Sequence, residues 1–377
     1  MDSRTNAMLK PPETKVTESP RIRVMVVDDS AIIRGLITRM LEANPAITVA
    51  ASCANGQAAI HELARTEVDL VVLDIEMPVM DGLTALPELL KLKPGLPVVI
   101  ASTLSQRNAE ISLKALSLGA ADYVPKPSGT GLGGSEDFRR ELVEKVLALG
   151  NRPRRHAPAA TAAVEAPVMA TAHASRPFAL RQPGAAKPHI LAIGSSTGGP
   201  PALNTFLALL RPSLRAPIVI TQHMPPTFTT ILAQQIAKTS GRPCHEAVDG
   251  ETILPGSIYV APGSYHMIFE RRGATCVARL NQEPPENFCR PAVDPMLRSL
   301  VRVFGANVLT VILTGMGADG KKGSQEVVAA GGTVVAQDEA SSVVWGMPGA
   351  VATAGLCAAV LPLPKLATYV MDAFGVK

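Results

Sequence analysis

The sequence predicts an α/β protein built from two doubly wound parallel-sheet domains that are joined by a flexible linker. A chain of 377 residues is longer than a domain with one ordinary hydrophobic core. Short apolar runs alternate with amphipathic windows in both halves of the chain, and an Ala/Pro-rich stretch separates the halves. We expect a disordered segment over residues 1–20, a first domain over 21–150, the linker over 151–187 and a second domain over 188–373.

The first half alternates strand and helix candidates. The strand candidates are residues 24–27, 48–51, 70–73, 98–101 and 122–124, and the helical windows are residues 31–43, 56–65, 83–92, 107–118 and 136–149. In the last window, large apolar residues recur at helical spacing. Strict alternation predicts a parallel sheet that is covered by helices on both faces.

The second half repeats this alternation without an internal sequence repeat. Its strand candidates are residues 189–193, 217–221, 257–260, 308–313, 333–336 and 358–361, and its helical windows are residues 201–210, 228–240, 294–304 and 322–330. We also expect an antiparallel element around residues 264–280.

Composition excludes several classes of function. The net charge is +4, the basic residues are scattered, and aromatic residues make up 3% of the chain, so we do not expect nucleic-acid binding. The five cysteines include no C-x-x-C pair, which indicates free thiols in a reducing compartment rather than zinc ligands or disulfides. There is no apolar signal region or membrane-spanning apolar run, so we expect a cytoplasmic protein without direct membrane insertion.

Polar residues follow several predicted strands of the first domain. Asp28 and Asp29 follow the first strand, Asp74 ends the third, Ser102 ends the fourth, and Lys126 follows the fifth. The carboxyl ends of parallel strands form the ligand-binding edge of such a sheet, so these side chains should meet there. Clustered carboxylates suit a hard cation such as Mg²⁺, with Asp74 as the attacking carboxylate in phosphoryl transfer.

These motifs resemble the receiver domain of two-component response regulators over residues 23–150. The resemblance rests on Val26-Val27-Asp28-Asp29-Ser30, on Leu73-Asp74-Ile75-Glu76-Met77-Pro78-Val79-Met80-Asp81-Gly82, and on Tyr123-Val124-Pro125-Lys126-Pro127. It implies a flavodoxin-like fold and phosphorylation of Asp74 by a histidine kinase. It also implies that Mg²⁺ is held by Asp28, Asp29, Asp74 and the Glu76 carbonyl, and that Ser102, Tyr123 and Lys126 form the switch.

A serine lies on the turn that opens the second domain. The strand candidate 189–193 runs into Gly194-Ser195-Ser196-Thr197-Gly198-Gly199-Pro200, where a helix begins. Glycines allow a sharp turn, and the helix N-terminus favours developing negative charge. The turn therefore nominates Ser196 as a nucleophile, with an anion-binding loop or a plain glycine-rich turn as the alternatives.

A serine nucleophile needs a base and an orienting carboxylate, and two assignments compete. His223 and Asp319 each follow a predicted strand and should share the edge with Ser196. Asp249 and His266 would instead give the chain order of an ordinary α/β-hydrolase. The shared strand ends favour the first assignment.

The second half is similar to the catalytic domain of the CheB family over residues 188–373. The motifs are Gly194-Ser195-Ser196-Thr197-Gly198-Gly199, Gln222-His223-Met224-Pro225, Ala261-Pro262-Gly263, Arg290-Pro291-Ala292-Val293-Asp294, Leu313-Thr314-Gly315-Met316-Gly317-Ala318-Asp319-Gly320 and Gly346-Met347-Pro348. The resemblance implies a Rossmann-like three-layer α/β/α domain. It makes Ser196 the nucleophile, His223 the base and Asp319 the orienting carboxylate, places Thr197 and Met316 near the oxyanion, and leaves His245, Asp249 and His266 structural or peripheral.

The CheB resemblance also implies an activity and its partners. The expected activity is hydrolysis of glutamate γ-methyl esters on chemoreceptors and deamidation of receptor glutamines. No cofactor is expected for this chemistry, and a CheA-type histidine kinase is the expected phosphodonor. We expect the unphosphorylated receiver to cover Ser196. A receiver-gated binding module with a vestigial triad and a receiver fused to a small-ester hydrolase are the alternative hypotheses.

Overall fold

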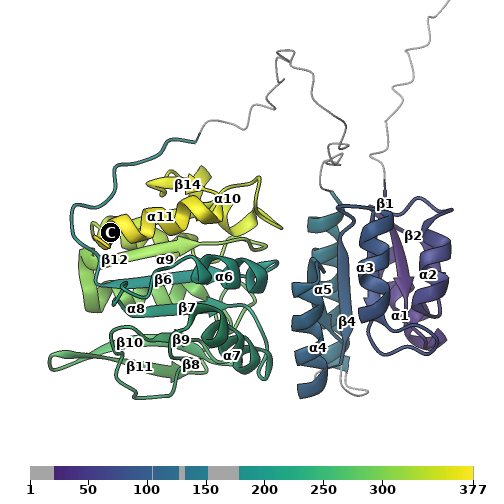
Figure 1. Ribbon diagram of the computed structural model, residues 1–377, viewed down its shortest axis with the longest axis horizontal. Helices are drawn as coiled ribbons and strands as arrows, with labels where there is room; N and C mark the ends of the chain where they lie inside the picture. Colours follow the sequence, from purple (N-terminus) through teal and green to yellow (C-terminus); the bar gives the residue numbers. More distant parts are fainter. Residues whose placement is uncertain (1–20, 104, 127–131, 152–177, 377) are drawn as a thin grey trace, which may run out of the picture.

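The computed structural model describes residues 21–103, 105–126, 132–151 and 178–376. The predicted disordered segment over residues 1–20 and most of the predicted linker lie outside these ranges. Two α/β domains stand beside each other, with the first in purple and blue and the second in green and yellow (Figure 1). In the described part of the chain, no helix combines the length and apolar character that a membrane span requires.

The first domain is a five-stranded parallel sheet in the order β2-β1-β3-β4-β5, with helices between successive strands. Its elements are β1 (Ile22–Val27), α1 (Ala31–Glu42), β2 (Ile47–Cys53), α2 (Gly56–Leu63), β3 (Leu70–Asp74), α3 (Gly82–Leu92), β4 (Val98–Ser102), α4 (Gln106–Ser117), β5 (Asp122–Pro125) and α5 (Leu132–Gly150). All residues of β3 and β4 are buried, as expected for central strands that are covered on both faces.

The second domain is a seven-stranded parallel sheet in the order β14-β13-β12-β6-β7-β9-β8, with an antiparallel hairpin of β10 and β11. Its elements are β6 (Ile190–Ser195), α6 (Gly199–Ala208), β7 (Ile218–Gln222), α7 (Phe228–Ser240), β8 (Cys244–Glu246), β9 (Ile258–Val260), β10 (His266–Arg272), β11 (Thr275–Asn281), α8 (Val293–Phe304), η1 (Gly305–Asn307), β12 (Val308–Ile312), α9 (Lys321–Ala329), β13 (Thr333–Gln337), α10 (Gly346–Thr353), β14 (Ala359–Leu361) and α11 (Leu363–Ala373).

The predicted fold class and the predicted strands and helices are confirmed, and the antiparallel element is the β10–β11 hairpin. Strand β8 and helices α10 and α11 were not predicted from the sequence. Strand β8 has three residues, which is too short for a periodic pattern. Helix α10 contains Pro348 and Gly349, which both disfavour helix. Helix α11 buries apolar residues at helical spacing, so its pattern was available in the sequence.

The register of the central strands determines where the polar residues emerge. β6 lies between β12 and β7, with Gly194 opposite Ile312 and Ser195 opposite Gln222. The chain therefore leaves each of these strands at the same edge of the sheet. Ser196 and His223 are the first residues after β6 and β7, so they begin the loops at that edge.

The two domains share apolar contacts. Helix α4 of the first domain contacts α6 and α7 of the second, and in Figure 1 these helices face one another. The ring of Tyr123, on β5, stacks on the ring of Phe228, at the start of α7, with a centroid distance of 4.5 Å and an interplanar angle of 9°. Both side chains are buried, so this stack joins the domains within one apolar cluster.

Candidate active site and candidate phosphorylation site

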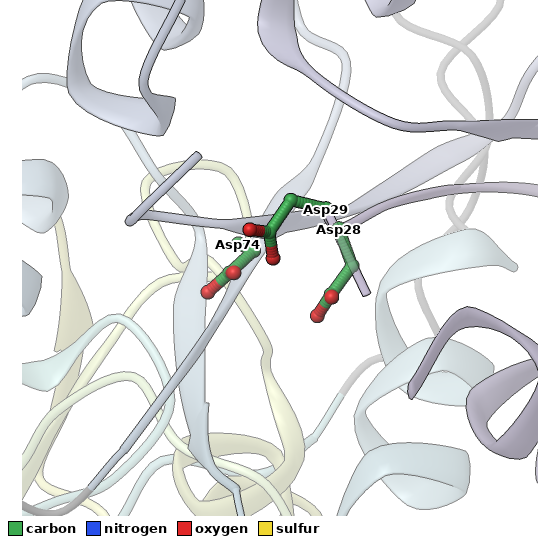
Figure 2. Close-up of side chains that lie close together, drawn as sticks. All are labelled: Asp28, Asp29 and Asp74. Carbon is green, nitrogen blue, oxygen red and sulfur yellow. The ribbon is translucent and has the colours of Figure 1, made fainter. Parts of the chain in front are cut away.

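Three carboxylates converge at the carboxyl edge of the first sheet. Asp28 and Asp29 follow β1 and Asp74 ends β3, and Figure 2 shows their side chains close together. One carboxylate oxygen from each lies within 4.8 Å of the others. Asp28 and Asp74 are buried, whereas Asp29 is exposed, so the cluster opens to solvent on one side.

Lys126 partly neutralises this cluster. Its Nζ lies 2.7 Å from Asp28 Oδ2 and 2.8 Å from Asp74 Oδ1. Burial raises the pKa of Asp74, and the nearby Lys126 charge opposes that increase. The Ile75 N–H also donates to Asp74 Oδ1 at 2.8 Å, which leaves the Asp74 carboxylate well oriented.

The donor set fits a hard divalent cation. Three carboxylates offer oxygen ligands around one point, and a single lysine does not balance their charge. Asp28, Asp29 and Asp74 could therefore hold Mg²⁺. Glu76, whose carbonyl is the further expected ligand, lies just beyond β3 with an exposed side chain.

The expected switch residues lie on the adjacent strands. Ser102 ends β4 and is buried, and its Oγ donates to the Thr103 carbonyl at 3.4 Å. The Lys126 N–H donates to the Ser102 carbonyl at 2.7 Å, so the two residues follow neighbouring strand ends. Tyr123 is instead packed on Phe228 in the domain interface.

Ser196 lies on a tight turn between β6 and α6. Its flanking residues are buried, whereas Ser196 is partly exposed. The turn depends on Gly198, which has a positive φ of 74° and lies where any Cβ would collide with Val343. Gly315 approaches from the other side, and a Cβ there would lie 2.9 Å from Ser196 Cβ.

The side-chain amides of Gln222 and Gln337, which were not predicted as site residues, hold this turn in place. Gln222 Nε2 donates to the Ser196 carbonyl at 3.0 Å, and Gln222 Oε1 accepts from Ser195 Oγ at 2.7 Å. The Ser196 N–H donates to the Thr314 carbonyl at 3.0 Å, and Gln337 Oε1 accepts from the Thr314 N–H at 2.8 Å. The sequence signal that could have identified Gln222 is its position at the end of strand β7, directly before His223 in the Gln222-His223-Met224-Pro225 motif.

His223 and Asp319 form a buried pair. His223 Nε2 lies 2.7 Å from Asp319 Oδ2. Burial alone would lower the pKa of His223, but its electrostatic interaction with Cys289 and its hydrogen bonds to Asp319 and Cys289 outweigh burial and raise the pKa to about 10.

Backbone and side-chain donors surround Asp319. Burial alone would raise the pKa of Asp319, but the hydrogen bond from His223 and further donors lower it below its usual value. These donors include the N–H groups of Val293 at 2.6 Å and Asp294 at 3.1 Å. The carboxylate is therefore held in one orientation and remains ionised.

Two further residues meet this pair, and both were missed. Asn287 Nδ2 lies 2.9 Å from Asp319 Oδ1 and 3.1 Å from Asp294 Oδ2. Burial and the Asp319 charge raise the pKa of Asp294 to about 6. Cys289 Sγ lies 3.3 Å from His223 Nδ1. Asn287 and Cys289 belong to an irregular loop without periodicity, so no sequence pattern indicated their positions.

Thr197 follows Ser196 directly, and Met316 lies on a neighbouring loop. Thr197 is buried, and its Oγ1 donates to Asp122 Oδ2 of the first domain at 2.6 Å. Met316 follows Gly315, which packs against Ser196, and its side chain is partly exposed.

The competing residues have other partners. His266 is buried, with Nδ1 accepting from the Ala292 N–H at 3.2 Å and Nε2 lying 3.1 Å from the Pro284 carbonyl. Asp249 bonds to the Leu280 N–H at 2.9 Å. His245 Nε2 lies 2.9 Å from Glu251 Oε2 on the surface. His266 and Asp249 therefore bond within or beside the β10–β11 hairpin, and His245 lies on β8.

Comparisons with known proteins agree with this architecture. Residues 191–370 match the CheB methylesterase family model, and residues 24–132 match the response regulator receiver domain model. Protein-glutamate methylesterase/protein-glutamine glutaminase 1 of Paramagnetospirillum magneticum is 57% identical over 93% of this chain and 95% of its own length. The protein of the same name from Rhodospirillum rubrum is 56% identical over 93% and 94%.

Among solved structures, the CheB methylesterase catalytic domain of Thermotoga maritima is 40% identical, with a TM-score of 0.48, and the match covers 50% of this chain and 99% of that one. The relatives match over nearly their whole length, through both domains. The chain therefore belongs to the CheB methylesterase family.

Proposed function

We propose that this protein hydrolyses glutamate γ-methyl esters on chemoreceptors, releases methanol, and deamidates specific receptor glutamines. Ser196 is the nucleophile, His223 the base and Asp319 the carboxylate that orients it. The observation that carries the proposal is the 2.7 Å contact between His223 Nε2 and Asp319 Oδ2 at the strand edge where Ser196 leaves β6. The names of the relatives supply the substrate class.

The orientation of the imidazole assigns the proton transfers. Because Nε2 faces Asp319, Nδ1 is the nitrogen that accepts the Ser196 proton as Oγ attacks the ester carbonyl. The imidazolium returns that proton to the departing methoxide, and methanol leaves an acyl ester on Ser196. The same base then deprotonates a water molecule, which hydrolyses the acyl ester to free glutamate.

The oxyanion needs donors beside Ser196. The Ser196 N–H already donates to the Thr314 carbonyl, so we assign the oxyanion to the Thr197 N–H at the approach to α6. We assign Met316 to the surroundings of the oxyanion, because it follows Gly315, which packs closely against Ser196.

We propose that phosphorylation of Asp74 by a CheA-type histidine kinase releases the active site. Mg²⁺ at Asp28, Asp29, Asp74 and the Glu76 carbonyl would neutralise phosphoryl oxygens when bound. Lys126 orients the Asp74 carboxylate, and Ser102 and Tyr123 move toward the new dianion. Tyr123 would then leave Phe228, which weakens the domain interface.

The test is methanol release from methylated chemoreceptors by the full-length protein, with and without a small-molecule phosphodonor. Ser196→Ala and His223→Gln should each reduce turnover by about 10³-fold or more, because members of a triad act as a unit. His266→Gln is the matched control and should retain activity per folded molecule. Asp74→Asn should retain basal turnover and lose the response to the phosphodonor. A normal rate in His223→Gln would remove His223 as the base.

A further inference from the structure

A thiol occupies the position where the base should receive its proton. Cys289 Sγ lies 3.3 Å from His223 Nδ1, and His223 Nε2 lies 2.7 Å from Asp319 Oδ2. The three residues form one continuous array of thiol, imidazole and carboxylate. This is the arrangement that activates a cysteine nucleophile, because the imidazole takes the thiol proton and the carboxylate stabilises the imidazolium.

Backbone and side-chain hydrogen bonds hold the loop that carries Cys289. Glu286 and Cys289 exchange two backbone hydrogen bonds, of 2.9 and 3.1 Å. The intervening Asn287 anchors the same loop to Asp319 at 2.9 Å. Cys289 is nevertheless partly exposed, as expected of a residue that reacts with a small reagent in solution.

We propose that Cys289 is a site of reversible oxidation by peroxides, and that its sulfenic acid withdraws His223 from hydrolysis. The effect on hydrolysis rests on the proposed function, whereas the oxidation of the thiol does not. The array thus serves two nucleophiles, Ser196 for the ester and Cys289 for the peroxide, through one shared imidazole.

The chemistry needs only a peroxide. The Cys289 thiolate attacks one oxygen of hydrogen peroxide, an S–O bond forms and the O–O bond breaks. Sulfur loses two electrons, and the departing hydroxide takes the imidazolium proton to become water. The O–H of the sulfenic acid is a stronger hydrogen-bond donor than the weak S–H of the thiol, so it holds the Nδ1 lone pair that Ser196 needs. A thiol reductant reverses the change by forming a mixed disulfide with loss of water, and a second thiol releases Cys289.

The other cysteines provide an internal contrast. Burial raises the pKa of Cys53, raises that of Cys276 to about 11, and raises those of Cys244 and Cys357 to about 12. Among the hydrogen bonds of the described residues, a cysteine–imidazole contact occurs only at Cys289. Oxidation by dilute peroxide should therefore select Cys289.

The experiment treats the full-length protein with hydrogen peroxide, traps sulfenic acid with dimedone, and locates the adduct by peptide mass spectrometry. In parallel, methanol release is measured before treatment, after treatment, and after dithiothreitol. We expect the adduct on Cys289, a loss of at least about tenfold in turnover, and recovery with dithiothreitol. Cys276→Ala, the matched control, should respond like the parent protein.

Each variant is compared with its own untreated rate. Cys289→Ala and Cys289→Ser should keep their untreated rates through the same peroxide treatment. The proposal is overturned if dimedone labels other cysteines in preference to Cys289, or if both Cys289 variants lose turnover as the parent does. If the untreated protein releases no methanol, the proposed function fails, and the labelling result alone decides whether Cys289 is the oxidised site.

Discussion

Thr197, the residue after Ser196, donates a 2.6 Å hydrogen bond from Oγ1 to Asp122 Oδ2, at the start of β5 in the other domain. Asp122 also pairs with Lys145 Nζ at 3.1 Å, and all three side chains are buried. A strand of the receiver domain is thus bonded directly to the turn that holds the proposed nucleophile. This contact and the Tyr123–Phe228 stack give the receiver two points of attachment beside the active site.

The first prediction concerns this attachment. Asp122→Ala removes the acceptor of the Thr197 hydrogen bond and one partner of Lys145, so the domains should separate more readily. We expect methanol release without phosphodonor to rise several-fold, and the further gain from phosphorylation to shrink. Asp69→Asn is the control, because Asp69 pairs with Arg23 elsewhere in the receiver domain. An unchanged basal rate in Asp122→Ala would show that this bond does not restrain the enzyme.

The second prediction concerns the carboxylate cluster. Lys126→Ala removes a cation that lies 2.7 Å from Asp28 and 2.8 Å from Asp74. We expect a loss of about 2 kcal/mol in stability at pH 7 in EDTA, as for other charged hydrogen bonds. Millimolar Mg²⁺ should restore part of it, because the cation takes over neutralisation of the carboxylates. Thermal unfolding with MgCl₂ or EDTA measures both effects, and Lys91→Ala on the surface is the control.

The pH dependence of this variant follows from Asp74. The pKa of Asp74 is raised in the folded protein, so the folded state favours the protonated acid. Stability is therefore lost as the pH rises from the pKa of Asp74 in the unfolded state through its pKa in the folded state. Without Lys126 the pKa of Asp74 rises further and that loss grows. The melting temperatures of Lys126→Ala and the parent should therefore converge toward pH 4. A difference that is constant from pH 4 to pH 7 would contradict this account.

The third prediction tests the packing behind Ser196. Gly315→Ala places a Cβ 2.9 Å from Ser196 Cβ and against Met347, so the serine must shift. We expect overpacking to cost about 1–3 kcal/mol in stability and turnover to fall by at least tenfold, since a displaced nucleophile loses its alignment. Gly35→Ala, where the added Cβ meets open space, is the control. Full turnover in a folded Gly315→Ala protein would show that the close approach is not required.

Residues that directly follow predictable strands could be placed from the sequence. Ser196 and His223 directly follow β6 and β7, and the parallel sheet brings them to one edge. Asp28 and Asp74 are brought together in the same way in the first sheet. Hydrophobic periodicity locates strands, and parallel topology then predicts which loops meet, so these placements required no knowledge of side-chain packing.

Residues outside regular elements could not be placed in this way. Asn287 and Cys289 belong to a loop between β11 and α8, and their positions depend on contacts with Asp319 and His223. The bond between Thr197 and Asp122 depends on how two separate domains dock. Such contacts arise from tertiary packing, which no local sequence period encodes.

The fourth prediction uses the acidity of His223. Burial lowers its pKa, but the electrostatic interaction and hydrogen bond with Cys289 and the contact with Asp319 together outweigh burial and raise the pKa to about 10. The base works only when neutral, so hydrolysis should increase with pH up to that value. Cys289→Ala removes two of the interactions that raise the pKa of His223. Only Asp319 then opposes the effect of burial, which lowers that pKa. We therefore expect the rising limb of kcat/KM for methanol release to move to lower pH.

Kinetics from pH 5.5 to pH 10.5 would measure this shift. Cys289→Ser replaces the thiol with a hydroxyl that stays uncharged over this range, so its rising limb should also move to lower pH. Cys276 makes no contact with an imidazole among the described hydrogen bonds, so Cys276→Ala should keep the pH profile of the parent protein. A parent-like limb in both Cys289 variants would mean that the sulfur, 3.3 Å from Nδ1, does not control the protonation of His223, because loss of an interaction that raises the pKa of the imidazole must lower that pKa.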